Sequence, residues 1–563
     1  MATHKNFELK FVPGLPLEKS MYPGLNEHSY VLKKGSVQKE GAMPLAADVL
    51  VEQDTQVKLR DGVTIRVDVY RPVDKKDCPV ILWYAPYGKR GSFLNYDNFQ
   101  HPTRMDIPRE WEDGLNSFEA PNPSYWVSHG YAVISPDPRG VGSSEGYVHA
   151  WGSQQSEDEY DLIEWAAAQE WSNGKVGLTG NSYLAMSQYA VAGIRPPHLA
   201  AIAPWEGAFS PYKDTMARGG IIDLGFNNTL TSMIFTNTGV EDVGTLMKEH
   251  PFYDEYWMDK EPDIENIEVP AYVVASWTNA LHSQGTIQAF LGMGSKEKWL
   301  RVHNTHEWTD YYRPEHVEDL RKFFDCYLKE IDNDWKETPK IRMSVLNPGH
   351  EDIVDRPYNE FPVPVEKDLY LNQKNGELVL STEAQSEECV ASYDATDNDG
   401  IKFSIKMNED MEWIGYGSMK LFVEIEAGDD MDVYAYVRKR DVNGNIIEPT
   451  VVTDRFYPGP NGQLRVSSRK LDEAKSTALA PKLAQVGEEK IAPNQIIPIE
   501  IPFWPFGMKW EAGETLELQI CPIGQIVRPE FPQIPQTPTI GTGKQIIHFG
   551  GQYDSKLRMP VVK

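Results

Sequence analysis

Residues 175–184 read KVGLTGNSYL, and this stretch decides the fold of the chain. An apolar strand runs into Gly-Asn-Ser and continues directly as a helix, which we expect over 184–192. Such a strand–turn–helix segment lifts a serine hydroxyl above the edge of a sheet, at the positive end of the helix. Gly180 is required because the turn leaves no room for a Cβ atom. The pattern predicts Ser182 as a nucleophile; the alternative is a serine that only caps the helix.

Further strands flank this segment on both sides. The residues around Asp61-Gly62 alternate as in a β-hairpin, and a helix is expected between Ser156 and Trp171. Short, continuous apolar runs, typical of strands buried on both faces, are PVILWY (79–84), YAVISP (131–136), LAAIA (199–203), AYVVAS (271–276) and WLRVH (299–303). Strands that alternate with helices predict a parallel, doubly wound α/β sheet.

Two regions depart from this alternation. Residues 208–268, rich in Gly, Met, Asn and aromatic residues, indicate a cap inserted over the site. After Pro348 short strands are separated by Gly, Pro and Asp turns, which predicts an all-β, jelly-roll domain. The predicted organisation is a surface leader (1–50), a core (51–207 and 269–350), the cap (208–268) and a β-sandwich domain (351–563).

The charge balance narrows the range of partners. With 55 basic and 83 acidic residues the net charge is −28, which argues against a nucleic acid or an anionic membrane. The N-terminus has no apolar signal region, and the four cysteines lie far apart, as expected in a reducing compartment. We therefore expect a cytoplasmic protein acting on a small molecule. Assembly into a homo-oligomer is left open.

Other catalytic groups are expected at the ends of neighbouring strands. Tyr87 follows the strand 79–84, so its hydroxyl and the backbone N–H of Tyr183 are candidate oxyanion donors. The alternative for Tyr87 is an aromatic wall. His306 follows the last strand, where the general base is expected, and His303 is the competing histidine.

Several motifs resemble one known family. They are DGVTIRVDVYRP (61–72), APYGK (85–89), SHGYAVISPDPRGVGSSEG (128–146), WSNGKVGLTGNSY (171–183), APWEG (203–207) and GQYDSKLRMPVV (551–562). With them, the chain from about residue 50 onward resembles the cocaine esterase and X-prolyl dipeptidyl-peptidase family of α/β-hydrolases. The resemblance implies an α/β-hydrolase domain, a helical cap and a C-terminal jelly roll. It also implies Ser182 as nucleophile, Tyr87 as oxyanion donor and a histidine at or near His306.

The acid of the triad is missing from its family position. Asn279 stands where the family carries an aspartate, and in a serine protease that exchange costs about 10⁴ in kcat. Glu206, directly after the strand 199–203, is the first candidate for a relocated acid; Glu307 and Asp310 lie beside His306. Alternatively, Asn279 is native and the enzyme is slow, or Asn279 was introduced to trap a complex.

Hydrolysis of an ester or amide of a small molecule through an acyl-enzyme on Ser182 is the leading functional hypothesis. An acyltransferase or cyclase that uses the same serine is the alternative within enzymes. A hydrolase that has lost activity and serves as a binding protein is the alternative from another class. No cofactor motif is recognised. His303 and His306 lack a third ligand at metal-site spacing, so no metal is expected.

Overall fold

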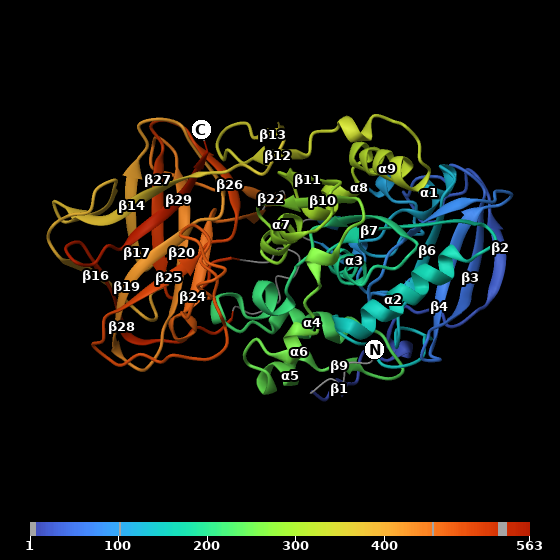
Figure 1. Ribbon diagram of the computed structural model, residues 1–563, viewed down its shortest axis with the longest axis horizontal. Helices are drawn as coiled ribbons and strands as arrows, with labels where there is room; N and C mark the ends of the chain where they lie inside the picture. The colour runs from blue at the N-terminus through green and yellow to red at the C-terminus, as the bar shows by residue number, and fades with distance from the viewer. Residues whose placement is uncertain (1–6, 101–102, 453–454, 527–536, 563) are drawn as a thin grey trace.

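An eleven-stranded sheet organises the N-terminal part of the computed structural model, which describes residues 7–100, 103–452, 455–526 and 537–562 (Figure 1). Its strand order is β13-β12-β11-β10-β8-β7-β5-β6-β4-β3-β2. The strands are β2 (His28–Leu32), β3 (Val49–Lys58), β4 (Thr64–Pro72), β5 (Cys78–Leu82), β6 (Ala132–Asp137), β7 (Ser172–Asn181), β8 (Leu199–Trp205), β10 (Ala271–Ser276), β11 (Lys298–His303), β12 (Ile341–Val345) and β13 (Ile353–Tyr358). The seven central strands from β12 to β6 are parallel, whereas β13, β4, β3 and β2 are antiparallel to their neighbours.

Helices cover both faces of this sheet, because successive side chains of each buried strand point to opposite faces. Val273 and Ala275 of β10 pack in the core that contains helices α2, α3 and α7, whereas Tyr272 and Val274 pack in the core that contains α1, α8 and α9. The helices are α1 (Pro123–Ser128), α2 (Gly152–Ala167), α3 (Tyr183–Gly193), α7 (Ser283–Gly292), α8 (Glu307–Tyr312) and α9 (Pro314–Leu328). The predicted doubly wound fold is confirmed. No helix in the described part of the chain is long and apolar enough to cross a membrane.

The segment between β8 and β10 forms the helical cap. It contains a π-helical turn (Pro211–Met216), α4 (Gly225–Met233), β9 (Val240–Glu241), α5 (Val243–Glu249) and α6 (Glu255–Met258). Met216, Leu246 and Trp257 form part of its small apolar core. The N-terminal residues are tied to two parts of the molecule: β1 (Phe11–Val12) pairs with β9 of the cap, and β2 forms the edge of the large sheet.

The C-terminal part is all-β, as predicted, and lies beside the α/β part in Figure 1. Its larger strands are β14 (Val365–Lys374), β16 (Cys389–Asp394), β17 (Ile401–Lys406), β19 (Ser418–Ala427), β20 (Asp432–Arg440), β24 (Asn461–Arg465), β25 (Ile497–Pro502), β26 (Phe506–Trp510), β27 (Thr515–Cys521), β28 (Thr542–Phe549) and β29 (Lys556–Val562). Its main path runs β16-β28-β19-β29-β14-β15-β17-β27-β20-β21, where β15 is Glu377–Ser381 and β21 is Ile446–Ile447. Strand β13 belongs to the large sheet, so that sheet extends past the predicted boundary between residues 350 and 351.

Candidate active site

Ser182 occupies a sharp turn between β7 and α3. Its backbone has φ 58° and ψ −118°, a conformation that costs a non-glycine residue about 1–3 kcal/mol. The turn is held because Ser182 N–H donates to the carbonyl oxygens of Trp205 (3.0 Å) and Glu206 (2.9 Å). A Cβ atom on Gly180 would lie 2.5 Å from Cδ2 of Leu184, so this glycine is required by the leucine two residues after the serine. The turn therefore presents the Ser182 side chain at the carboxyl edge of the sheet.

Tyr87 lies on the loop after β5 and lines the same cavity as Ser182. Burial raises the pKa of the Tyr87 hydroxyl well above its usual value, so the group stays protonated and able to donate. Its ring makes edge contacts with Phe118 (5.5 Å between centroids) and Tyr183 (5.9 Å). The Tyr183 hydroxyl donates to Gln155, while its backbone N–H belongs to the first turn of α3, whose amides have no partner within the helix.

Buried ion pairs anchor the loop that carries Tyr87. Lys89 Nζ lies 2.8 Å from Oδ1 of Asp54 and 2.5 Å from Oδ2 of Asp137, and all three side chains are fully buried. The Lys89 backbone N–H also donates to Asp137, and Ser117 Oγ donates to the carbonyl of Gly88 (2.6 Å). These contacts hold the tyrosine hydroxyl in a fixed position beside the serine.

The imidazole that contacts Ser182 belongs to His282. Ser182 Oγ lies 3.2 Å from Nε2 of His282, and Nδ1 of His282 lies 3.2 Å from Oε2 of Glu307. His282 caps the start of α7, and Glu307 is the first residue of α8. All three side chains are buried. The result is a serine, an imidazole and a carboxylate in hydrogen-bonding sequence.

Sequence reasoning did not single out His282, and it considered Glu307 only as a neighbour of His306. The available signal was position: His282 lies three residues after Asn279, in the loop that follows β10. Loops after neighbouring parallel strands meet at the same edge of the sheet, so any polar residue there was a candidate.

His306 lines the same cavity but has a different hydrogen-bonding role. Its Nδ1 accepts the backbone N–H of Trp308 (3.3 Å), which caps the start of α8, and its ring lies 4.9 Å from the Trp308 ring. A neutral imidazole that accepts at Nδ1 carries its proton on Nε2. The pattern at His282 is the opposite: a carboxylate faces Nδ1 and a hydroxyl faces Nε2, as a general base requires.

Asn279 acts on the backbone of the turn that carries His282. Its Oδ1 accepts the N–H groups of Leu281 (2.9 Å) and His282 (3.1 Å), and its own N–H donates to Ser283 Oγ (3.1 Å). Asparagine side chains commonly stabilise turns in this way. The amide therefore orients the loop rather than an imidazole ring.

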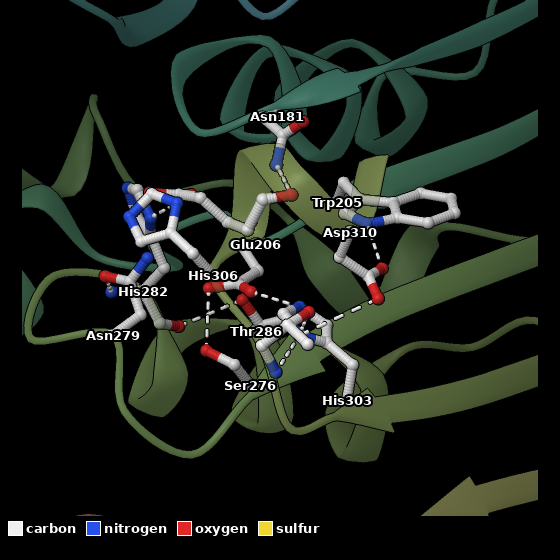
Figure 2. A network of polar contacts seen from close by, with 12 residues as sticks. Asn181, Trp205, Glu206, Ser276, Asn279, His282, Thr286, His303, His306 and Asp310 are labelled. Carbon is white, nitrogen blue, oxygen red and sulfur yellow. Dashed lines mark hydrogen bonds and ion pairs between the residues drawn. The ribbon is translucent and has the colours of Figure 1, made fainter. Parts of the chain in front are cut away.

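Glu206 does reach a histidine, and that histidine is His303. Figure 2 shows the network: Oε1 of Glu206 lies 2.5 Å from Nε2 of His303, and Oε2 accepts Ser276 Oγ at 3.0 Å. Asp310 continues it, 3.8 Å from Nδ1 of His303 and ion-paired with Arg301. Burial alone would raise the pKa of Asp310, but Arg301 and the histidines hold it well below its usual value. This charged network lies beneath the serine turn.

Glu206, His282 and Glu307 also offer ligand atoms within 4.8 Å of one another, close enough to hold a metal ion. Glu206 already pairs with His303, while His282 already contacts both Ser182 and Glu307. The proximity places a second negative charge near the His282 ring. This charge favours the protonated imidazole that forms when the ring accepts a proton.

The cavity above Ser182 is small and mostly apolar. Its volume is about 40 Å³, and α4 of the cap supplies Phe226 and Leu230 to its wall. Val451 reaches it from the C-terminal part of the chain. Glu119 adds a carboxylate to the wall, with Oε1 accepting Trp308 Nε1 at 2.8 Å. Three parts of the molecule therefore enclose the serine.

Comparisons with known proteins agree with this arrangement. Residues 61–242 match the model of the X-Pro dipeptidyl-peptidase (S15) family, and residues 333–558 match its C-terminal non-catalytic domain. A CocE/NonD family hydrolase from Staphylococcus aureus of known structure is 32% identical, with a TM-score of 0.88 over 96% of this chain and 97% of that one.

Curated relatives match over shorter stretches. Cocaine esterase from Rhodococcus is 33% identical over 154 residues, which is 27% of this chain and 23% of the esterase. Xaa-Pro dipeptidyl-peptidase from Lactobacillus helveticus is 22% identical over 217 residues, 35% of this chain and 26% of the peptidase. The aligned stretches thus span less than a third of the length of these two relatives.

Proposed function

Because the chain belongs to the CocE/NonD family of serine hydrolases, we propose that it cleaves an ester or amide of a small molecule through an acyl-enzyme on Ser182. The observation that carries the proposal is the hydrogen-bonding row Ser182–His282–Glu307 beside the protonated hydroxyl of Tyr87. A hydrolase that had lost activity would have no reason to keep all of these groups aligned.

In the proposed reaction, His282 Nε2 takes the Ser182 proton as Oγ attacks the substrate carbonyl. The Tyr87 hydroxyl and the backbone N–H of Tyr183 donate to the resulting oxyanion. Glu307 supplies the counter-charge to the imidazolium. His282 then gives the proton to the leaving alcohol or amine, and the carbonyl–heteroatom bond breaks to leave the acyl-enzyme. His282 then takes a proton from a water molecule that attacks the ester, and returns it to Ser182 Oγ as the acyl–oxygen bond breaks and the acid is released.

We assign the base to His282 instead of His306, and the acid to Glu307 instead of Asn279 or Glu206. The reason is the hydrogen-bond pattern of each group. His306 accepts a backbone N–H at Nδ1, Asn279 accepts backbone N–H groups, and Glu206 pairs with His303. In this proposal Asn279 and Glu206 position the catalytic groups.

The leucine and aromatic side chains of the cavity wall favour a substrate with an apolar acyl group. Glu119 on the wall favours a substrate with an N–H or O–H group to donate. The relatives comprise an esterase and Xaa-Pro dipeptidyl-peptidases, so the proposal includes both esters and amides.

Labelling with a fluorophosphonate, followed by peptide mapping, tests the nucleophile. The label is expected on Ser182, and Ser182→Ala is expected to lose both labelling and turnover of p-nitrophenyl acetate while it keeps its thermal stability. Rapid quenching with intact-mass analysis should detect the acetyl-enzyme. Turnover that persists in Ser182→Ala would contradict the proposal. Adding an alcohol as a competing acceptor measures acyl transfer against hydrolysis.

A further inference from the structure

A second, larger cavity lies between the cap and the C-terminal part of the chain. Its volume is about 610 Å³, and it shares no lining residue with the cavity above Ser182. The π-helical turn of the cap and helix α7 form one side, and strand β24 with the loops around residues 482 and 504 forms the other. Figure 1 shows the cap next to the C-terminal strands, and the Arg218–Asn461 hydrogen bond joins the two parts. We call this cavity the interdomain crevice.

Two cations line the interdomain crevice without a carboxylate partner among the described residues. Lys482 Nζ lies 5.1 Å from the centre of the Tyr416 ring, and no ion pair within 4.0 Å joins it to a described carboxylate. The Arg218 guanidinium donates to Asn461 (2.7 Å to Oδ1) and lies 3.9 Å from the centre of the Trp504 ring. By contrast, Lys213 in the same crevice pairs with Glu261 at 3.2 Å. In a chain of net charge −28, unpaired and largely buried cations are unexpected.

The acid whose charge acts on Lys482 is Asp214, which already accepts hydrogen bonds from the backbone. Asp214 is buried, and its Oδ2 accepts the backbone N–H groups of Phe209 (2.9 Å) and Ser210 (2.8 Å). Burial raises the pKa of Asp214 to about 6, so its negative charge is itself disfavoured. Burial also lowers the pKa of Lys482. Lys482 therefore feels the charge of Asp214 but forms no ion pair within 4.0 Å with a described carboxylate.

The remaining wall combines flat apolar surface, an unused acceptor and the acidic residues Glu261, Asp263, Glu265 and Asp472. Phe209, Phe503 and Trp504 line the crevice together with three prolines, Pro262, Pro481 and Pro502. Gln284 Oε1 is buried without a hydrogen bond, while its Nε2 donates to Gln288. A buried carbonyl without a partner costs free energy that a bound donor recovers.

We propose that the interdomain crevice binds a small organic anion, a carboxylate or phosphate carried on a flat apolar body. Lys482 and Arg218 supply the positive charge, the aromatic wall packs against the apolar body, and Gln284 accepts a hydrogen bond from the ligand. The site is separate from the proposed catalytic cavity and does not depend on the proposed function.

Calorimetric titration of the full-length protein with benzoate tests this site, after Ser182 has been blocked with a fluorophosphonate so that the catalytic cavity is closed. Benzoate is expected to bind the blocked protein, and benzamide, its neutral analogue, to bind at least about tenfold more weakly. Lys482→Gln should weaken the binding of benzoate by about tenfold or more. Lys475 is an exposed cation of the same crevice, and its Nζ lies 3.6 Å from Asp472. The variant Lys475→Gln should leave the affinity for benzoate unchanged.

Several results would overturn the proposal. They are equal affinity for benzoate and benzamide, equal effects of Lys482→Gln and Lys475→Gln, or no heat of binding at all. Inorganic phosphate that binds as tightly as benzoate would refute the role of the aromatic wall. If Lys482→Gln lowers the Tm, Lys482→Arg replaces it as the informative variant, and it must retain benzoate binding because it retains the charge.

Discussion

His282 Nδ1 and Glu307 Oε2 lie 3.2 Å apart, although each residue comes from the loop where its partner was expected. In this fold the acid normally follows the next-to-last strand and the histidine follows the last. Here the histidine follows β10 and the carboxylate follows β11. The exchange is sterically possible because β10 and β11 are adjacent and parallel, with Ser276 opposite His303, so both loops start at the same level of the sheet.

Replacing the two histidines of the cavity separately identifies the base. His282→Ala is expected to lower kcat/KM by about 10⁴ or more, because Ser182 loses its proton acceptor. His306→Ala is expected to lower kcat/KM by less than about 10², since the Nδ1 of His306 caps a helix. Steady-state kinetics with an activated ester measures both, and fluorophosphonate labelling rates provide a second readout. A greater loss in His306→Ala would transfer the base to that residue.

Glu307→Gln and Glu206→Gln separate catalysis from stability. Glu307→Gln should lower kcat by about 10³ to 10⁴, because the imidazolium loses its counter-charge. Glu206→Gln breaks the buried pair with His303 and should lower the free energy of unfolding by about 3–5 kcal/mol, with the smaller effect on kcat. Denaturant unfolding and kinetics of both variants check this. The opposite ranking in kcat would make Glu206 the relocated acid.

Asn279 variants test whether its amide acts on the backbone. Asn279→Asp keeps an oxygen that accepts from Leu281 and His282, so kcat/KM should change by less than about tenfold. Asn279→Ala removes the acceptor, loosens the turn and should lower kcat more than Asn279→Asp does. A gain of about 10² or more in Asn279→Asp would show that this position is an uncompensated triad acid after all.

Tyr87→Phe removes one proposed oxyanion donor and keeps the ring contacts with Phe118 and Tyr183. We expect kcat to fall by about 10² to 10³, the usual effect of losing one such donor, with little change in Tm. The matched comparison is Tyr96→Phe, a buried tyrosine of the neighbouring aromatic cluster that does not line the cavity. Equal activity of wild type and Tyr87→Phe would show that Tyr87 only lines the cavity and donates no catalytic hydrogen bond.

Asp214 gives stability a pH dependence of known sign. Its pKa in the folded state is raised by burial to about 6 from 3.8, so the folded protein holds this proton more tightly than the unfolded chain. The contribution of Asp214 to the free energy of unfolding is therefore greatest below about pH 4 and is lost as the pH rises through about 6. The free energy of unfolding of Asp214→Asn, measured relative to that of the wild type, should rise by about 2–3 kcal/mol between pH 4 and pH 8. Chemical denaturation across this pH range measures the difference, with the exposed variant Asp74→Asn as the control.

The sequence by itself determined the framework and predicted the proposed nucleophile. Strand–turn–helix patterning around Ser182, continuous apolar strands and the change to short strands after Pro348 are local signals, and each depends on residues close together in the chain. The sheet, the helical cap and the all-β part follow from them. Tyr87 could be predicted from the sequence for the same reason, because its motif directly follows a recognisable strand.

Only the tertiary structure decided which imidazole and which carboxylate meet the serine. His282 and Glu307 are 100 and 125 residues from Ser182 in the sequence, and three loops bring them together at one edge of the sheet. Strand patterns place loops at that edge, but the direction of a side chain within a loop depends on its turn and caps. The Asn279 turn directs His282 toward the serine, and the cap of α8 turns His306 Nδ1 to a backbone amide. Two histidines at equivalent ends of adjacent strands therefore differ through hydrogen bonds that sequence periodicity does not encode.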